Sequence, residues 1–157
     1  MQKSINFLIL FFSVVFIFSC KKEEESYPDM PNTGEIKALT YNVAGLPEGI
    51  NPDQHPTKHM QLVSPLLNAY DLVNVQEDFF YHDSLYKYIN LPYKSTYFAK
   101  PGELGDGLNC ISNIPFIDFT RITWDSCNGF DCFTPKGFTY SRLRFNKNVF
   151  VDLYNVH

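Results

Sequence analysis

Between residues 35 and 157 the chain consists mainly of short segments in which polar and apolar residues alternate, a pattern typical of half-buried β-strands. Strands of this kind are predicted at residues 36–43, 71–79, 108–112, 116–124 and 148–157, and residues 125–145 are expected to form a loop that runs into a further strand. Residues 56–70 instead place apolar side chains at helical intervals, and Pro65 is expected to kink this helix or to start a new turn. Strands that outnumber helices, with a helix between two of them, favour a mixed α/β sandwich over a barrel or a bundle.

The composition indicates one globular domain and argues against a nucleic-acid partner. Of the 157 residues, 45% are hydrophobic and 17% are aromatic, which lies outside the disordered range. The formal net charge is -4, and residues 1–19 hold a single lysine, so the rest of the chain carries -5. No global basic field is present that would attract a polyanion such as duplex DNA.

The start of the chain predicts export from the cytoplasm. Lys3 precedes an apolar run from Phe7 to Phe18, which is interrupted only by Ser13. The run is roughly half as long as a membrane-spanning helix, and it fits the hydrophobic region of a signal peptide at residues 1–19.

The run ends in IFSC and is followed by KKEEE, which resembles the lipobox of bacterial lipoproteins. The resemblance implies that Cys20 is lipidated and becomes the mature N-terminus, although Phe18 is bulkier than the residue usual at that place. Ordinary secretion and an uncleaved anchor are the alternatives. Residues 20–34 carry charges, two prolines and no apolar periodicity, which predicts a solvated tether before a folded unit at 35–157.

Three predicted strands end in side chains that suit metal-assisted chemistry. Asn42 precedes the turn-forming AGLPEG, Glu77 follows an apolar strand, and His157 ends the last strand. A carboxylate beside an amide oxygen suits Mg²⁺, which prefers oxygen ligands and keeps waters that a phosphate can displace. A nearby histidine can hydrogen-bond a phosphoryl oxygen or assist proton transfer, so the pattern indicates phosphoryl chemistry.

Each of these residues also has a structural interpretation. Glu77 could be an ordinary strand-end carboxylate, and Asn42 could be an amide that caps the backbone before a turn. His157, at the end of the chain, could be a solvated imidazole. The residue types alone leave both interpretations open.

Five motifs in order along the chain resemble the endonuclease/exonuclease/phosphatase superfamily of Mg²⁺-dependent phosphodiesterases. The motifs are LTYNVAGLP, DLVNVQEDF, GDGLNCISNIPF, KGFTY and VDLYNVH, and the match extends from about residue 36 to residue 157. Within the superfamily, CNGFDCFTPKGFTY most resembles a stretch of bacterial neutral sphingomyelinases and their secreted relatives.

The resemblance implies a fold and a set of roles. The fold would be a DNase-I-like four-layer sandwich of two mixed β-sheets flanked by helices, with the active site at one rim. Glu77 would be the principal ligand of Mg²⁺ or Mn²⁺, and Asn42 would help to hold the metal and its waters. His157, catalytic together with Asn42, would hydrogen-bond the scissile phosphate or its leaving group.

The family pattern contains further motifs that this sequence lacks. A later half supplies an Asp-x-Asn strand and a final Asp-His pair, which furnishes the general base. We therefore expect the N-terminal half of such an enzyme, with a truncated α/β sandwich at residues 35–157. Half a sandwich exposes a sheet face and strand edges, so this unit is predicted to be marginally stable or inactive by itself.

One lysine and three cysteines predict supporting features. Lys136 in PKGF is a weak candidate for substrate binding, and a solvated lysine near a glycine turn is an equal alternative. Cys127 and Cys132 enclose a short loop in an exported protein, which favours a disulfide. Cys110 lies in an apolar strand and is expected to be a buried free thiol.

Other polar residues are assigned structural positions. His55 and His59 lack a third ligand, which favours surface residues over a zinc site. His82 is expected to be a solvated loop histidine. The Gly-Asp-Gly sequence at residues 105–107 predicts a tight turn, because no helix start follows it that could cradle a phosphate.

Two classes of function follow. The first is a Mg²⁺-dependent phosphoester hydrolase, a phosphodiesterase of the sphingomyelinase type, whose substrate is a small or lipid phosphoester. It would act at the bacterial cell envelope, held at the membrane by its lipid anchor, or as a secreted protein. The second is a catalytically dead surface lipoprotein with a binding or structural role. The sequence predicts no oligomeric state.

Overall fold

The computed structural model describes residues 26–30, 34–50 and 55–157. The predicted signal peptide at residues 1–19 and the predicted lipidation site at Cys20 lie outside the described residues. In the part of the chain that the structure describes, no helix is both long and apolar enough to cross a membrane.

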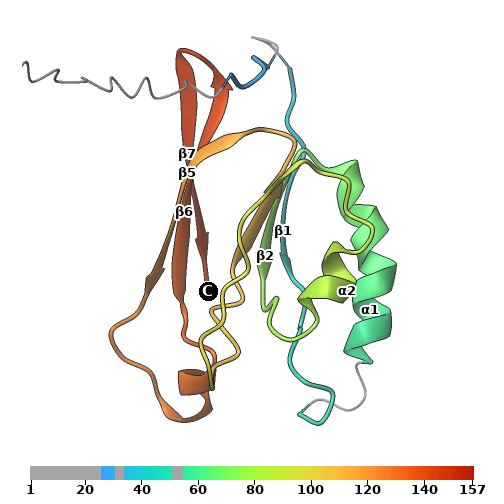
Figure 1. Ribbon diagram of the computed structural model, residues 1–157, viewed down its shortest axis with the longest axis vertical. Helices are drawn as coiled ribbons and strands as arrows, with labels where there is room; N and C mark the ends of the chain where they lie inside the picture. The colour runs from blue at the N-terminus through green and yellow to red at the C-terminus, as the bar shows by residue number, and fades with distance from the viewer. Residues whose placement is uncertain (1–25, 31–33, 51–54) are drawn as a thin grey trace, which may run out of the picture.

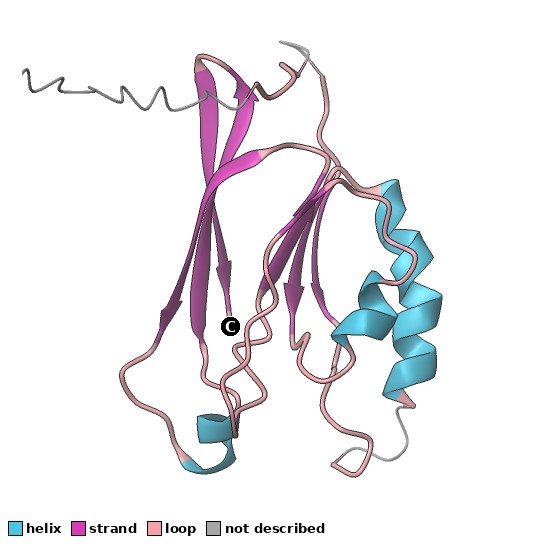
Figure 2. Ribbon diagram, in the orientation of Figure 1, coloured by secondary structure: helices cyan, strands magenta, loops and turns pink. Residues whose placement is uncertain are grey.

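The described residues form three layers: helices, a mixed sheet and an antiparallel sheet (Figures 1 and 2). The mixed sheet lies in the middle, with helices on one side and the antiparallel sheet on the other. The predicted partial α/β sandwich is confirmed, with the difference that only one of its two sheets is mixed. Its second sheet is antiparallel, because each of its consecutive strands reverses direction and pairs with the strand before it.

The mixed sheet has the strand order β1-β2-β4-β3. It is composed of β1 (Ala38–Asn42), β2 (Leu72–Gln76), β3 (Tyr93–Lys94) and β4 (Asn109–Ser112). Strands β1 and β2 are parallel, in a register that pairs Asn42 with Gln76. All five residues of β2 are buried, as expected for a central strand covered on both faces.

The antiparallel sheet has the strand order β5-β6-β7. It is composed of β5 (Phe116–Thr123), β6 (Gly137–Asn146) and β7 (Val149–Val156). A loop that contains the short helix η3 (Gly129–Phe133) joins β5 to β6. Only two residues separate β6 from β7, so these strands form a hairpin.

The crossover between β1 and β2 consists of two helical pieces, and a third helix follows β2. The pieces are α1 (Pro56–Val63), the 3-10 helix η2 (Ser64–Ala69) and α2 (His82–Tyr86). Pro65 lies in the first turn of η2, so the predicted new turn at this proline is confirmed. Met60 and Leu67 are buried as the helical spacing predicts, whereas Leu66 is 66% exposed because the 3-10 turn rotates it away from the core.

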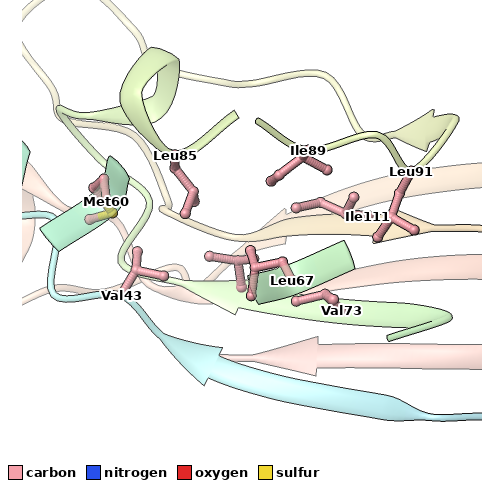
Figure 3. Close-up of a cluster of buried hydrophobic side chains, with 9 residues drawn as sticks. Val43, Met60, Leu67, Val73, Leu85, Ile89, Leu91 and Ile111 are labelled. Carbon is pink, nitrogen blue, oxygen red and sulfur yellow. The ribbon is translucent and has the colours of Figure 1, made fainter. Parts of the chain in front are cut away.

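Two apolar clusters hold the layers together. The cluster between the helices and the mixed sheet contains Val43, Met60, Leu67, Val73, Val75, Leu85, Ile89, Leu91 and Ile111 (Figure 3). The cluster between the two sheets contains Leu72, Cys110, Ile114 and Leu143, with Met30, Phe116, Phe119, Phe145 and Leu153 packed against it. Full burial of one such side chain stabilises the folded state by about 1.5–3 kcal/mol. The strands that lead to Asn42, Glu77 and His157 therefore belong to a well-packed scaffold.

The predicted tether differs from the structure in its last part. Met30 packs on the cluster between the sheets, and its N–H donates to the carbonyl of Phe145 at 2.6 Å. Arg144 Nη2 donates to Asp29 Oδ1 at 2.9 Å. Residues 29 and 30 are therefore docked on β6, a contact that so short and aperiodic a segment does not reveal in its sequence.

Candidate active site

Asn42 and Glu77 meet at the carboxyl end of the parallel strand pair. Asn42 is the last residue of β1, and Glu77 directly follows β2, so the in-register pairing brings both to one edge of the sheet. Asn42 Nδ2 donates to Glu77 Oε1 at 3.0 Å, and Asn42 Oδ1 accepts from the N–H of Ala44 at 2.9 Å. The amide thereby fixes the orientation of one carboxylate oxygen.

His157 reaches the same edge from the antiparallel sheet. The pairing of β6 with β7 continues beyond β7, because His157 and Gly137 exchange backbone hydrogen bonds of 3.0 and 3.1 Å. His157 Nε2 lies 3.5 Å from Glu77 Oε1, and the two side chains are 19% and 23% exposed. Among the described residues His157 Nδ1, which is buried, has no hydrogen-bond partner. The structure thus brings the three predicted residues, Asn42, Glu77 and His157, into one partly exposed cluster.

Two amide side chains align the sheets behind this cluster. Gln76 Nε2 donates to Asn155 Oδ1 at 2.5 Å, and Asn155 Nδ2 donates to two backbone carbonyls of the mixed sheet. Gln76 directly precedes Glu77, and Asn155 lies two residues before His157 on the same face of the strand. The amide pair therefore sets the relative position of the sheets that brings His157 to Glu77.

The backbone of Glu77 is held in a left-handed conformation with φ of 58°. Such a conformation costs a residue other than glycine on the order of 1–3 kcal/mol and persists only where its surroundings fix it. Here the carbonyl of Glu77 accepts from the N–H of Gly45 at 2.9 Å, and the N–H of Asp78 donates to the carbonyl of Gly107 at 3.0 Å. A Cβ at residue 107 would lie 3.0 Å from Glu77 Cα, so this approach requires glycine.

A buried carboxylate lies behind the rim, which is the sheet edge where Asn42, Glu77 and His157 meet. Asp78 is fully buried, and its Oδ2 accepts hydrogen bonds of 2.7 Å from both His82 Nδ1 and Asn109 Nδ2. The ring of His82 packs against the rings of Tyr86 and Tyr97, with centroids 3.9 and 4.5 Å away. Burial, followed by the Asp78 carboxylate, raises the pKa of Tyr97. The prediction of a solvated His82 is wrong, because Asp78 and the two tyrosines hold the ring.

Arg121 joins the antiparallel sheet to the loop that supports this carboxylate. Its Nη1 donates to both carboxylate oxygens of Asp106, at 2.6 and 2.9 Å, and its Nη2 donates to Asn109 Oδ1 at 2.8 Å. The Arg121 and Asp106 side chains are only 14% and 3% exposed. The predicted tight turn at residues 105–107 is absent, and these residues form a buried loop instead. Asp106 in this loop pairs with the Arg121 guanidinium, which agrees with a structural role rather than a phosphate cradle.

No established family model matches the chain. The sphingomyelinases of Mycobacterium tuberculosis and Mycobacterium bovis are each 39% identical to it over 137 residues, a match that covers 80% of this chain and 27% of the relative. Over these residues the chain is similar in sequence to bacterial sphingomyelinases. It spans about a quarter of the length of these curated relatives.

Solved structures show the fold of this chain. A mutant of beta toxin from Staphylococcus aureus with bound magnesium ions matches with a TM-score of 0.66 at 20% identity, over 79% of this chain and 49% of that chain. Sphingomyelinase C from Streptomyces griseocarneus matches with a TM-score of 0.61 at 20% identity, over 80% of this chain and 49% of that chain. The predicted DNase-I-like fold and the predicted resemblance to the N-terminal half of such proteins are confirmed.

The donor set at the rim of this chain fits Mg²⁺ in its chemistry. Mg²⁺ is usually held by one or two carboxylates and keeps several waters, and Glu77 offers a carboxylate that solvent still reaches. Asn42 directs its nitrogen to Glu77 and its oxygen to the backbone, which suits a residue that orients a metal ligand. In the described ranges, no group of three His, Cys, Asp or Glu side chains could hold an ion, so waters would complete the ligand set.

The remaining predicted residues lie in the loop between β5 and β6 and in β4. Lys136 Nζ lies 3.4 Å from Asp131 Oδ1 in η3, and its contact with a substrate stays a prediction. Cys127 and Cys132 form a disulfide with Cα atoms 5.1 Å apart, which closes the loop that contains η3. Cys110 is a buried free cysteine, as predicted.

The two histidines of the β1–α1 region have separate partners. His55 Nδ1 lies 2.9 Å from Glu48 Oε1, and His59 Nε2 lies 3.3 Å from Tyr41 Oη. Both histidines are exposed, as predicted for surface residues.

Sequence reasoning missed the buried polar residues that support the rim: Gln76, Asp78, Asn109, Arg121 and Asn155. The available signal was a polar residue among apolar neighbours in a strand, as in the segment LNCI around Asn109. The partners could not be read from the sequence, because Asn155 and the carbonyl of Val75 are 80 residues apart.

Proposed function

We propose that this chain carries the metal-binding part of the active site of a Mg²⁺-dependent phosphodiesterase that acts on lipid phosphodiesters of the sphingomyelin type. The observation that carries the proposal is the cluster in which Asn42 and His157 both approach Glu77 Oε1, at 3.0 and 3.5 Å. Homology to sphingomyelinases supports the substrate class, and the net charge of -4 favours a small or lipid phosphoester over duplex DNA.

Each residue of the cluster has a distinct task in this proposal. Glu77 holds the ion, and the bound Mg²⁺ offsets negative charge that develops on the phosphoryl group. Asn42 keeps the Glu77 carboxylate in the orientation that presents it to the ion. His157 directs Nε2 to the same point, where it donates a hydrogen bond to a phosphoryl or leaving-group oxygen.

The same proposal places the protein at the bacterial cell envelope. The signal peptide at residues 1–19 exports the chain, and a lipid on Cys20 holds it at the membrane, where lipid substrates reside. Radiolabelled palmitate is expected to label the wild-type protein and not a Cys20→Ser variant in the bacterial host. Label that persists in the variant would remove the anchor from the proposal.

Hydrolysis of sphingomyelin in mixed micelles, followed by phosphocholine release with Mg²⁺ and with EDTA, tests the activity. Mn²⁺ binding, followed by electron paramagnetic resonance, is measured on the same samples. Loss of a residue that only orients a metal ligand typically weakens metal binding by about 10- to 100-fold. Glu77→Gln is expected to weaken Mn²⁺ binding by more than this and to abolish phosphocholine release. Glu48→Gln makes the same charge change at an exposed glutamate that pairs with His55. This variant should change neither Mn²⁺ binding nor phosphocholine release. Equal ion binding by wild type and Glu77→Gln would overturn the proposal.

A catalytically inert surface module is the second candidate. It is favoured by the finding that, within the described segments, one carboxylate and one histidine meet at the rim without a third acidic or histidine ligand. This candidate predicts Glu77-dependent Mn²⁺ binding without phosphocholine release. Phosphocholine release that requires Glu77 would exclude it.

A further inference from the structure

Residues 26–30, the docked segment, are held at the end of the antiparallel sheet where β6 turns into β7 (Figure 1). The N–H of Met30 donates to the carbonyl of Phe145 at 2.6 Å. Asp29 Oδ1 accepts from Arg144 Nη2 at 2.9 Å. The segment is therefore attached to the last part of β6 through both backbone and side chains.

Further contacts strengthen this docking. Arg144 Nη1 donates to the carbonyl of Tyr27 at 3.1 Å, and the Arg144 side chain is only 17% exposed. The ring of Tyr27 lies 6.4 Å from that of Tyr93 in the mixed sheet, and Met30 packs on the apolar cluster between the sheets. The docked segment thus contacts both sheets.

The rim lies at the other end of the antiparallel sheet. The backbone of His157 pairs with that of Gly137, the first residue of β6, and Phe145 lies eight residues farther along this strand. A strand rises about 3.3 Å per residue, so about 26 Å of β6 separate the docked segment from the rim. Figure 1 shows the docked segment beside the β6–β7 turn and the end of the chain at the opposite end of β7.

The docked segment limits where the rim can lie relative to a membrane attached at Cys20. Six residue steps lead from Cys20 to residue 26, and a fully extended chain of this length spans at most about 21 Å. This reach is shorter than the about 26 Å of strand between the docked segment and the rim. The docked chain therefore cannot place its rim end-on against the membrane that anchors it.

Release of the docked segment would remove this limit. Eighteen residue steps lead from Cys20 to Ala38, the first residue of β1, and they span up to about 60 Å when extended. Ala38 is in turn only four residues from Asn42 at the rim. An undocked chain has enough length to turn its rim toward the anchoring membrane.

We propose that the docked segment directs the rim away from the membrane that anchors the protein, so that the lipid substrate lies in a second, apposed lipid surface. The proposal rests on the proposed function, from which it takes the anchor at Cys20 and the lipid phosphodiester. It adds that the membrane that holds the protein does not supply its substrate.

The position of Trp124 relative to the membrane tests this orientation without any need for activity. Trp124 is the one tryptophan of the sequence, and its N–H donates to the carbonyl of Lys136, at the rim end of β6. The full-length protein is coupled to vesicles through Cys20 and a maleimide lipid, since Cys110 is buried and the other two cysteines form a disulfide. Energy transfer from tryptophan to dansyl lipid in the vesicle is then measured.

The expected transfer depends on the place of the donor. Asn148→Trp combined with Trp124→Phe moves the donor to the β6–β7 turn, and transfer should exceed that of wild type at least about threefold, because about 30 Å of sheet separate the two positions. Asp29→Ala combined with Met30→Ser weakens docking and should raise transfer from Trp124 at least about twofold. Equal transfer from both donor positions would overturn the proposal.

Two arginines of β6 provide a matched pair of variants. Arg144→Ala removes the docking contacts from the side of the sheet and should raise transfer from Trp124 as the double variant does. Arg142→Ala, two residues away, breaks only a surface pair with Asp152 and should leave transfer unchanged. Transfer that stays at the wild-type level in Arg144→Ala and in the double variant, or that rises equally in Arg142→Ala, would overturn the role of the docked segment.

Dilution of the vesicles tests the consequence for activity. Protein is coupled to vesicles that contain sphingomyelin, and phosphocholine release per protein is followed with Mg²⁺. Hydrolysis within the vesicle that holds the protein is independent of vesicle concentration, whereas hydrolysis on another vesicle is bimolecular, so about tenfold dilution should lower wild-type release about tenfold. Release by the double variant of Asp29 and Met30 should change less than about twofold. A wild-type rate that dilution leaves unchanged would overturn the proposal.

The two proposals fail in different ways. Absence of phosphocholine release at every vesicle concentration, together with the expected order of energy transfer, would reject the proposed activity and support the orientation. Release that requires Glu77, together with equal transfer from both donor positions, would support the activity and reject the orientation.

Discussion

Glu77 illustrates at the residue scale how strain accompanies a candidate functional group. Its left-handed backbone is unfavourable by itself, and two neighbouring segments, which contain Gly45 and Gly107, maintain it through backbone hydrogen bonds and one glycine approach. The acidic side chain was predicted from its place after a strand. The backbone conformation of Glu77 was not predicted, because nothing in the sequence Gln76-Glu77-Asp78 requires a positive φ.

Gly107→Ala tests this dependence. A Cβ there would lie 2.5 Å from Phe79 Cε1 and 3.0 Å from Glu77 Cα, so the turn must shift and Mn²⁺ affinity should fall at least about tenfold. Gly102→Ala is the matched control, since Gly102 also has a positive φ, of 85°, but a Cβ would meet no atom within 4 Å. Mn²⁺ titration of both variants checks the prediction, and equal losses would mean that backbone strain alone matters.

Cys110 predicts a pH dependence of stability. Burial raises the pKa of its thiol from about 9 to about 11, and a hydrogen bond with Ser141 only partly opposes this shift. Between these values the unfolded chain loses the thiol proton first, so the free energy of unfolding falls as pH rises, by up to about 2 kcal/mol. Urea denaturation from pH 8 to 11 should show a shallower decline in Cys110→Ala, and identical slopes would contradict the shift.

At the scale of elements, alternation of polar and apolar residues located the strands well. It predicted β1, β2, β4, β5 and β7 within a few residues, because each presents one face to a core, and the strand predicted after the loop in residues 125–145 is β6. It did not reveal the short β3, nor the docking of residues 29–30 on β6. Two-residue segments carry no period, so their positions depend on contacts that the rest of the fold supplies.

The amide link between β2 and β7 gives the prediction for this scale. Asn155→Ala leaves Gln76 Nε2 without its acceptor on β7 and two buried carbonyls without this donor, which should destabilise the protein by about 2–4 kcal/mol. Asn148→Ala, in the exposed turn between β6 and β7, should have little effect. Thermal unfolding of the two variants provides the measurement, and similar melting temperatures would contradict the role of the link.

At the scale of the whole molecule, Arg121 is the main polar connection between the sheets outside the amide link. Arg121→Ala removes the partner of the buried Asp106 carboxylate, so we expect a loss of about 3–5 kcal/mol in the free energy of unfolding. Arg142→Ala breaks an equally short pair with Asp152 that lies on the surface, and its unfolding should match wild type. Urea denaturation measures both, and equal effects would show that burial of the pair is irrelevant.

The overall sandwich was predicted from five ordered motifs, whereas the alignment of its two sheets was not. The three rim residues come from strands 35 and 80 positions apart, and only the paired sheets make them neighbours. The buried residues that enforce this arrangement, Asn155 and Arg121, have partners in distant segments. The candidate site could therefore be listed from the sequence, but its supports required the structure.

Anomalous diffraction from Mn²⁺-soaked crystals tests the central claim most directly, because it locates the ion relative to named atoms. We predict an anomalous peak about 2–2.3 Å from a Glu77 carboxylate oxygen, with His157 beside it, and no peak there in Glu77→Gln crystals. At saturating Mn²⁺, a rim without a peak, or a peak that persists in the variant, would contradict the account.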